Sequence, residues 1–444
     1  MVAMNSLLIH TEATVAVDPF TKVLIYLIII LVSAKLGAEL FERLKQPAVL
    51  GELVAGVILG NITLVNRTWN IFEPMRITNV TDHAAIAVGM LASLGIIILL
   101  FEVGLESSVR DMRRVGVLSF FVALVGVIAS FVLGYFISTF FIREVPKQVL
   151  EVAQNFNIHI IHMFIGAALC ATSVGITARV FHDIGRSQMI EARIVLGAAV
   201  VDDVLGLIIL AVVSAIVASA EAGTVPSLLG VAELTLAAIG FLIGALVVGS
   251  LLIPRVIGLA AKFKTHGLML ITALIICFGL ASLAGWVGLA PIVGAFAGGL
   301  LLEEIQFKDF GSDVRIKDLI SPISTLLVPI FFVQMGIQVH LESFLNPSVI
   351  GISAGLIAAA AIGKQACGLV VWQNGIDRLT VGIGMIPRGE VELIFAGIGR
   401  SLGIFSNEIF SAIVVMVMVT TFLTPPLLKW SIGRKEKSEA RSQI

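Results

Sequence analysis

The feature that most constrains this chain is a series of apolar segments, each near the length that a helix needs to cross a lipid bilayer. Hydrophobic residues make up 58% of the 444 residues, and charged residues only 13%, about half the fraction typical of soluble domains. Hydropathy predicts thirteen such segments, at about 20–43, 47–63, 83–106, 114–141, 158–182, 190–219, 228–262, 266–286, 289–303, 321–340, 348–373, 379–401 and 406–430. The sequence therefore predicts an all-α polytopic membrane protein with a short basic tail, 431–444.

The distribution of basic residues predicts the orientation of these segments. Twenty of the 29 Lys and Arg fall in loops after odd-numbered segments or in the tail, and six fall on the opposite side. Cytoplasmic loops carry the excess of Lys and Arg, so we expect the N-terminus outside a cell membrane and the C-terminus in the cytoplasm. Three Asn-x-Thr sequences, at Asn61, Asn66 and Asn79, lie in a loop expected to be external, although chance explains such short patterns as readily as glycosylation does.

Two pairs of segments resemble one another. The sequence from Gln46 to Gly60 matches the sequence from Leu289 to Leu302, and "IILLFEVGLES" matches "VPIFFVQMGIQV" with Gly104 on Gly336. The matching segments are seven positions apart, so the two copies cross the membrane in opposite directions. This predicts two inverted six-helix repeats, an architecture that places substrate and ion sites near the midplane.

The fifth and twelfth segments are predicted to be broken helices. The fifth contains "LCATSVGITARV", with Thr172 and Ser173, and the twelfth contains "GIGMIPRGEVELI", with Pro387 among three glycines. Proline removes a helical hydrogen bond and clashes with the preceding turn. Interrupted helices at corresponding positions of two repeats point to a transporter binding site.

Two adjacent acids, Asp202 and Asp203, lie near the middle of the sixth segment in "GAAVVDDVLGLIILAVV". An intramembrane acid costs at least about 2.5 kcal/mol on insertion scales, so it is by default a functional residue that needs a partner. Neighbouring helix positions point about 100° apart, so the two acids need not share a role. Lys364, near the middle of the eleventh segment, is the natural partner for one of them, either as a structural salt bridge or as part of the transport chemistry.

Three further charges, Arg388, Glu390 and Glu392, lie in the broken twelfth segment. We expect Arg388 and Glu390 to form a structural pair that offsets local charge and the dipoles of the half-helices. Glu392 reaches either another backbone end or a water cavity in this interpretation, and we assign it no role. The sequence offers neither a nucleophile with a metal-ligand array nor a Gly-rich phosphate loop, so we expect no enzyme activity, no cofactor and no nucleic-acid partner.

These residues together predict a type of chemistry. A midplane aspartate reached by water can hold a proton or a small cation, and the hydroxyls and freed carbonyls of a broken helix are hard oxygen ligands suited to alkali ions. If one carboxylate serves both, their binding is mutually exclusive. Competition for one acid predicts exchange of a cation for protons.

The residues "VVDDVLGL", the "ATS" of the fifth segment, the midspan lysine and "GMIPRGEVELIFA" resemble the monovalent cation:proton antiporter superfamily, specifically its second branch of bacterial and archaeal sodium/proton antiporters. The resemblance covers the whole membrane region. It implies a thirteen-helix homodimer that works by an elevator-type movement. It also implies a dimerisation panel (20–106 and 266–340), a mobile core (114–219 and 348–430) and a linker helix (228–262).

The resemblance also implies residue roles. Asp203 would bind the transported sodium and the competing proton, Asp202 would bridge to Lys364, and Thr172 and Ser173 would lie at the crossing of the broken helices. An aspartate at 202 favours electrogenic sodium/proton exchange. The residues leave three alternative functions open: a potassium/proton antiporter on the same fold, a cation channel, and a membrane sensor. Na⁺, with Li⁺ or K⁺ as alternatives, and H⁺ are the expected substrates.

Overall fold

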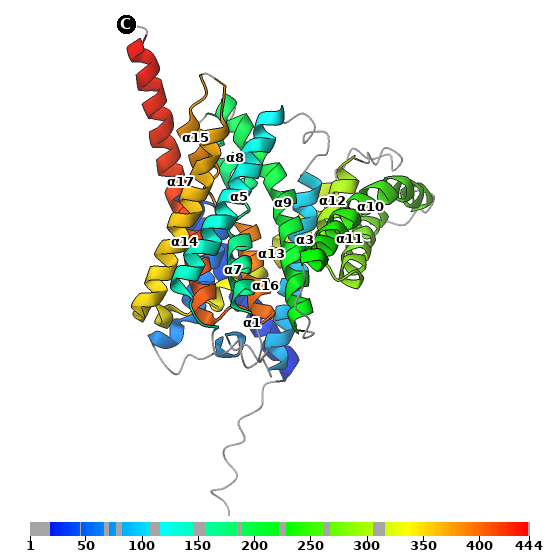
Figure 1. Cartoon of the computed structure of the whole chain (residues 1–444). Coiled ribbons are helices and arrows are strands. Elements are labelled where there is room, and N and C mark those ends of the chain that lie inside the picture. The colour runs from blue at the N-terminus through cyan, green and yellow to red at the C-terminus, as the bar shows by residue number, and fades with distance from the viewer. Residues whose placement is uncertain are drawn as a thin grey trace, which may run out of the picture.

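The computed structural model describes residues 18–442 except 45, 66–70, 77–81, 107–115, 146–156, 184–185, 187–188, 222–227, 261–266, 305–315 and 374. Helices form the architecture throughout this part of the chain, which contains no strand. Among the described residues, nine helices are long and apolar enough to cross a membrane, and three shorter apolar helices accompany them. The chain is therefore an all-helical multi-pass membrane protein (Figure 1).

The helices follow in the order predicted from hydropathy. Those before the middle of the chain are α1 (Pro19–Arg43), α2 (Ala48–Gly60), α3 (His83–Glu106), α5 (Gly116–Phe141), α7 (Ile158–Ala168), α8 (Val174–Asp183) and α9 (Ile190–Glu221). A long helix, α10 (Leu228–Ala260), precedes α11 (Leu268–Trp286), α12 (Pro291–Glu304), α13 (Ile316–Ile337), α14 (Pro347–Gln365), α15 (Arg378–Gly384), α16 (Glu390–Ser401) and α17 (Asn407–Ser442). Short 3₁₀ turns include η2 (Glu73–Met75) and η4 (Leu341–Leu345).

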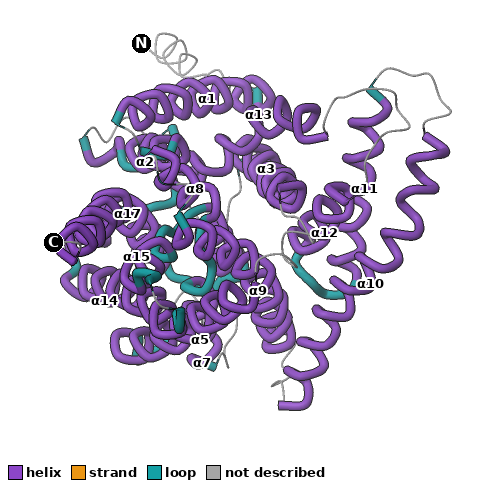
Figure 2. The backbone as a smooth tube through the Cα atoms, turned by 90° about the horizontal axis from the view of Figure 1, so that it is seen from above, coloured by secondary structure: helices purple, strands orange, loops and turns teal. Residues whose placement is uncertain are grey.

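The helices form two neighbouring groups. Seen along the helix axes, α1, α13, α3, α12 and α11 follow one arc, and α5, α14, α15 and α17 lie together beside it (Figure 2). We call the end of the bundle at which α1 begins the N-terminal face, and the end from which α17 projects the C-terminal face. Helices α7 and α16 lie toward the N-terminal face, and α8 and α15 lie toward the C-terminal face (Figure 1).

Helices α2 and α13 cross in backbone contact. A Cβ atom at Gly56 would lie 2.1 Å from the carbonyl oxygen of Val333, and one at Gly336 would lie 2.2 Å from that of Leu53. No real side chain fits at such distances, so glycine is required on both helices. Small residues at a crossing let helix backbones approach closely, which strengthens packing where lipid supplies no hydrophobic driving force.

Helices α3 and α12 cross in the same way. A Cβ atom at Gly104 would lie 2.3 Å from the carbonyl oxygen of Phe296, and one at Gly299 would lie 2.1 Å from that of Phe101. The second helix of one half of the chain thus packs on the third helix of the other half, at both crossings. These crossings hold the arc of helices together.

Candidate functional site

Two helix interruptions meet inside the bundle. Helix α7 ends at Ala168 and α8 begins at Val174, while α15 ends at Gly384 and α16 begins at Glu390. The backbone N–H of Ser173 donates to the carbonyl of Pro387, at 3.0 Å, and so joins the two interruptions directly. The extended segments between the half-helices therefore lie against one another.

Threonine hydroxyls satisfy the carbonyls at the end of α15. Thr172 Oγ1 donates to Met385 O and Thr177 Oγ1 donates to Gly384 O, each at 3.1 Å. The last carbonyls of a helix have no partner within it, so each needs one from outside. A hydroxyl that donates its proton keeps lone pairs on oxygen. Both threonines, which are 1% exposed or less, therefore present acceptor oxygens beside the crossing.

Arg388, in the interruption between α15 and α16, contacts the interruption between α7 and α8. Its side chain is fully buried and Nη1 donates to the carbonyl of Ala171. Nη2 lies 3.4 Å from Ala360 O and 3.5 Å from Ser130 Oγ, on α14 and α5. A cation beyond the end of α7 offsets the negative end of that helix dipole. Arg388 therefore ties the interruptions to α5 and α14.

Glu392 is the acid that pairs with Arg388. Its Oε1 lies 3.3 Å from Arg388 Nη1, and its Oε2 accepts the backbone N–H of Gly389 at 2.8 Å. An acid in the first turn of α16 is stabilised by the helix dipole and satisfies a free N–H group. The sequence predicts Glu390 as a partner of Arg388; the side chain of Glu390 lies outside the described residues, so that pairing stays a prediction. The sequence carried a signal for Glu392, because a glutamate three residues after a helix cap reaches back to the cap.

The first aspartate of α9 pairs with the lysine of α14. Lys364 Nζ donates to Asp202 Oδ2, and both side chains are fully buried. The lysine side chain passes close to Gly126 of α5, where a Cβ would lie 3.5 Å from Nζ. Asp202 Oδ1 is buried with no hydrogen-bond partner in the part of the chain that the structure describes. The carboxylate is therefore neutralised in charge while one of its oxygens remains available.

The second aspartate lies on the same helix and faces a different direction. Asp203 is 5% exposed, and its side chain points about 100° away from that of Asp202. One turn further along α9, a Cβ at Gly206 would lie 3.5 Å from the Cβ of Ala171. Asp202 and Asp203 lie four and three residues before Gly206, so α9 passes the α7–α8 interruption within a turn of both acids.

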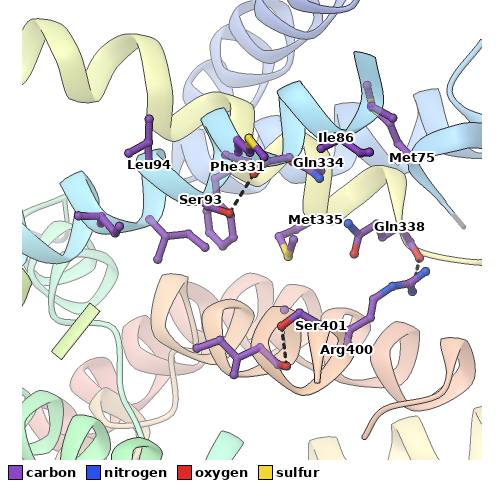
Figure 3. A pocket seen from close by; sticks show the side chains of 18 residues that line it. Met75, Ile86, Ser93, Leu94, Phe331, Gln334, Met335, Gln338, Arg400 and Ser401 are labelled. Atoms are coloured by element: carbon purple, nitrogen blue, oxygen red, sulfur yellow. Dashed lines mark hydrogen bonds between the residues drawn. The ribbon is translucent and has the colours of Figure 1, made fainter. Parts of the chain in front are cut away.

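A cavity of about 730 Å³ opens between α3, α13 and α16 (Figure 3). Ser93 and Gln334 belong to the walls formed by α3 and α13, and Arg400 and Ser401 lie on α16 opposite. The residues of α3 that line it run from Ala85, in the first turn of the helix, to Ile97, just past its middle. Asp203 is not among the lining residues. The cavity thus extends from the N-terminal end of α3 to about the middle of that helix, and neither aspartate lines it.

Comparisons with known proteins agree with this architecture. The family model for the transmembrane sodium/hydrogen exchanger matches residues 27–430. The high-affinity Na⁺/H⁺ antiporter NhaS3 of Synechocystis sp. is 36% identical, over 97% of this chain and 94% of the relative. The Na⁺/H⁺-K⁺ antiporter GerN of Bacillus cereus is 30% identical, over 94% of this chain and 97% of the relative.

A solved structure shares the fold. The structure of the sodium proton antiporter MjNhaP1 from Methanocaldococcus jannaschii superposes with a TM-score of 0.63 at 18% identity, covering 94% of this chain and 98% of that chain. The family match and the two relatives extend over nearly the whole chain, including the aspartates, the lysine and both interruptions. The chain is a member of the sodium/hydrogen exchanger family, within the monovalent cation:proton antiporter superfamily.

Proposed function

We propose that this protein is a sodium/proton antiporter in which Asp203 binds the transported sodium and the competing protons in turn. The observation that carries the proposal is that Lys364 pairs with Asp202. We assign the carrier role to the adjacent acid Asp203, whose side chain leaves α9 in another direction. The family match and the names of the relatives support the same reaction.

The carboxylate of Asp203 supplies the exchange. A buried carboxylate binds either a proton or a cation, because either one removes the cost of its isolated charge. The hydroxyl oxygens of Thr172 and Ser173 and the carbonyls of the interruption are the hard oxygen ligands that complete a sodium site. Binding at one group is mutually exclusive, so a protein that changes its open side only when that group is occupied exchanges the two ions.

The Lys364–Asp202 pair makes the exchange electrogenic in this proposal. Sodium beside the aspartates competes with the ammonium for the carboxylate, which favours loss of the lysine proton because desolvation disfavours an uncompensated ammonium. One sodium then displaces protons from two groups, Asp203 and Lys364. More than one proton moves for each sodium, and the exchange carries net charge.

An elevator movement fits the packing. We assign the arc of helices (20–106 and 266–340) to a dimerisation panel, residues 114–219 and 348–430 to a moving core, and residues 228–262 to a linker. The reciprocal glycine crossings, and the equal spacing of Gly51 to Gly56 and Gly294 to Gly299 in helices that pack on α1 and α11, support two inverted six-helix repeats. The cavity between α3, α13 and α16 lies along the boundary between these parts.

The remaining features complete the proposal. Thirteen membrane segments place the N-terminal face outside the cell membrane and the basic tail in the cytoplasm, and the protein forms a homodimer through the panel. Glycosylation has no support at Asn61, whose amide is buried and donates to Val57 O and Val339 O; Asn66 and Asn79 lie outside the described residues.

Transport in proteoliposomes tests the proposal. Sodium, lithium and potassium are each added to vesicles with an internal pH dye, and the Asp203→Asn variant is measured beside the unmodified protein. We expect sodium-dependent proton movement that the variant abolishes. A response to potassium alone would identify the second candidate, potassium/proton exchange, which the name of the GerN relative favours. Cation conduction without proton movement would identify a channel.

A further inference from the structure

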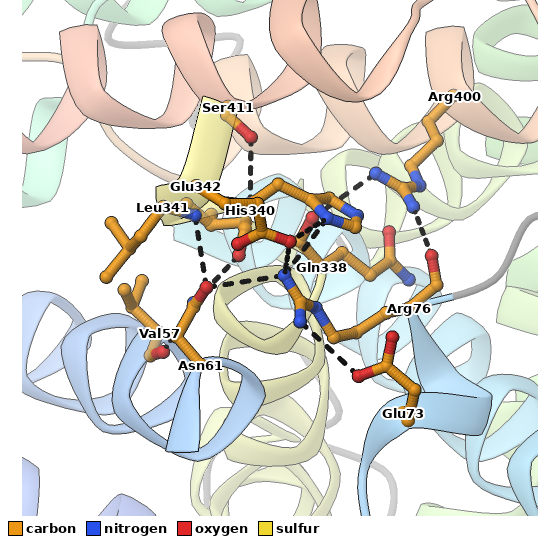
Figure 4. Close-up of polar contacts among 11 residues, drawn as sticks. Val57, Asn61, Glu73, Arg76, Gln338, His340, Leu341, Glu342, Arg400 and Ser411 are labelled. Carbon is orange, nitrogen blue, oxygen red and sulfur yellow. Dashed lines mark hydrogen bonds and ion pairs between the residues drawn. The ribbon is translucent and has the colours of Figure 1, made fainter. Parts of the chain in front are cut away.

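A cluster of polar and charged side chains joins the end of α2, the segment that follows α13, and α16 (Figure 4). It comprises Asn61 at the end of α2, Arg76 after η2, His340 and Glu342 at the start of η4, and Arg400 on α16. We call these five residues the clasp. None of them is needed for the binding of a cation at Asp203, and the two arginines are buried, at 4% and 6% exposure.

Arg76 is the centre of the clasp. Its Nη2 donates to Glu342 Oε1 at 2.7 Å and to Asn61 Oδ1 at 3.3 Å, and it lies 3.0 Å from His340 Nδ1. Asn61 Oδ1 also accepts the backbone N–H of Leu341 at 3.0 Å. The end of α2 and the segment that leaves α13 are thus joined through one guanidinium. Charge-assisted hydrogen bonds of this kind are about twice as strong as neutral ones.

Arg400 connects this group to the other part of the molecule. Its Nη2 donates to the carbonyl of Arg76 at 2.7 Å and its Nη1 to the carbonyl of Gln338 at 3.3 Å. Its guanidinium lies 5.0 Å from the centre of the Phe410 ring on α17. Arg400 belongs to the proposed core, while both carbonyls belong to the proposed panel. Its bonds therefore cross the boundary along which the core must slide, beside the cavity that Arg400 also lines.

We propose that the clasp holds core and panel in the arrangement seen here, with the cavity open at the N-terminal face, and that it must release before the core can move. This inference rests on the proposed function. A core displacement of even one helical turn, about 5 Å, would carry Arg400 out of hydrogen-bonding range of both carbonyls. The strength of the clasp therefore sets the balance between the two access states.

His340 makes the clasp sensitive to protons at the N-terminal face. Its Nδ1 lies 3.0 Å from both Arg76 Nη2 and Glu342 Oε1, and its Nε2 is buried with no partner in the described structure. Neutral histidine can accept a hydrogen bond from Arg76 through Nδ1, and protonated histidine cannot. Protonation also sets a positive charge against Arg76, near Arg400, and among the described residues Glu342 and the half-exposed Glu73 are the acids that offset it. Acid at this face therefore weakens the clasp.

Thiol labelling of the cavity tests the clasp without measuring transport. Ser93 is exposed, lines the cavity and is replaced by cysteine, while the native cysteines Cys170, Cys277 and Cys367 are buried. The full-length Ser93→Cys protein in sealed proteoliposomes is treated with a membrane-impermeant maleimide. We expect Arg400→Gln in this background to lower the labelling rate about twofold or more, because the open state loses population.

A matched variant controls for loss of surface charge. Arg143→Gln removes an exposed arginine, close to the Phe140 ring and beyond the end of α5 on the same face, and it should leave the labelling rate unchanged. An unchanged rate in Arg400→Gln overturns the clasp. If Arg400→Gln does not fold, the clasp is tested with a second variant, His340→Gln.

His340→Gln keeps a side-chain acceptor for Arg76 and removes the titration. The labelling rate of Ser93→Cys is divided by that of the double variant, which carries both Ser93→Cys and His340→Gln. This ratio cancels the pH dependence of the thiol itself. We expect this ratio to fall about twofold as the pH is lowered from about 8 to about 5, the range in which histidine changes charge. A constant ratio overturns the proton sensitivity of the clasp. Failure of the proposed function would show separately, as exchange that persists in Asp203→Asn.

Discussion

Lys364 on α14 donates a hydrogen bond to Asp202 on α9, and neither side chain has any exposed surface. The two residues are 162 positions apart in the sequence and belong to different halves of the chain. The ion pair therefore links the halves at the depth of the helix interruptions. It also gives the buried carboxylate of Asp202 a compensating charge.

Removal of one partner of this pair should be far more damaging than removal of both. Lys364→Met leaves a buried carboxylate without its cation, which costs about 3–5 kcal/mol, whereas replacing both members of a buried pair by neutral groups is often close to neutral. We expect Asp202→Asn/Lys364→Met to recover most of the thermal stability that Lys364→Met loses. Thermal unfolding in detergent measures this double-mutant cycle. Additive losses in the double variant would argue against the coupling.

Asp203→Asn should abolish cation-dependent proton movement while leaving the fold intact. The amide has nearly the same shape, yet it neither carries a proton in this pH range nor neutralises a cation. Asp318→Asn, at an exposed acid in the first turn of α13, is the matched control and should transport normally. Dye-based proton flux in proteoliposomes reports both, and residual exchange in Asp203→Asn would move the carrier role elsewhere.

A lysine at position 388 should not be able to make the contacts of the Arg388 guanidinium. The guanidinium reaches Ala171 O, Ala360 O and Glu392 on three different elements, and a single ammonium cannot span the same fork geometry. We expect Arg388→Lys to cost about 2 kcal/mol or more in stability and to reduce transport. Glu392→Gln is the milder comparison, because its amide oxygen can still accept the Gly389 N–H. Equal stability of the two variants by thermal unfolding would contradict this.

Alanine at a glycine crossing should destabilise the panel. A Cβ at Gly56 would lie 2.1 Å from Val333 O, so α2 and α13 would have to separate. Forced overpacking costs about 1–3 kcal/mol. Gly258→Ala on α10, where nothing lies within 4 Å of the added Cβ, should be neutral or slightly stabilising. Melting temperatures of the purified variants compare the two sites.

The C-terminal face should lose stability in acid through Asp377. Burial alone would raise the pKa of this carboxyl, but hydrogen bonds from Thr380, Arg434 and the Leu379 N–H outweigh burial and hold its pKa below the usual value. A lowered pKa contributes stability above the unfolded pKa, and this contribution disappears as the pH falls through the folded pKa. At about pH 7, the backbone amides of α17 that follow Ser431 should therefore exchange their hydrogens faster in Asp377→Asn than in the unmodified protein. The two should converge below the folded pKa.

The sequence could predict the parts of this molecule that depend on periodicity and on the cost of buried charge. The helix order followed from apolar segments, and a midspan lysine needs an acid wherever the fold places it, so its pairing with an aspartate was foreseeable. The contact between Arg388 and Glu392 was harder to predict. Glu390 and Glu392 are both near in sequence, and only the first turn of α16 places Glu392 Oε2 on the Gly389 N–H.

The clasp illustrates what the sequence could not indicate. Arg76 and His340 are 264 positions apart, in irregular segments whose geometry no hydrophobic period determines. Each looks like an ordinary loop residue in isolation. The burial of Arg76 and its contact with His340 arise only when η2, η4 and α16 come together, which is a property of the tertiary fold.

The reciprocal glycine crossings have a mechanical consequence. Backbone atoms of α2 already touch α13, and backbone atoms of α3 already touch α12, so the arc has no free space through which to compress and no soft side chains to absorb a load. Close-packed interfaces of this kind have low compressibility. In the proposed elevator movement, work released when an ion binds beside α9 would therefore not be lost in bending this wall. It would move the neighbouring helices along the wall.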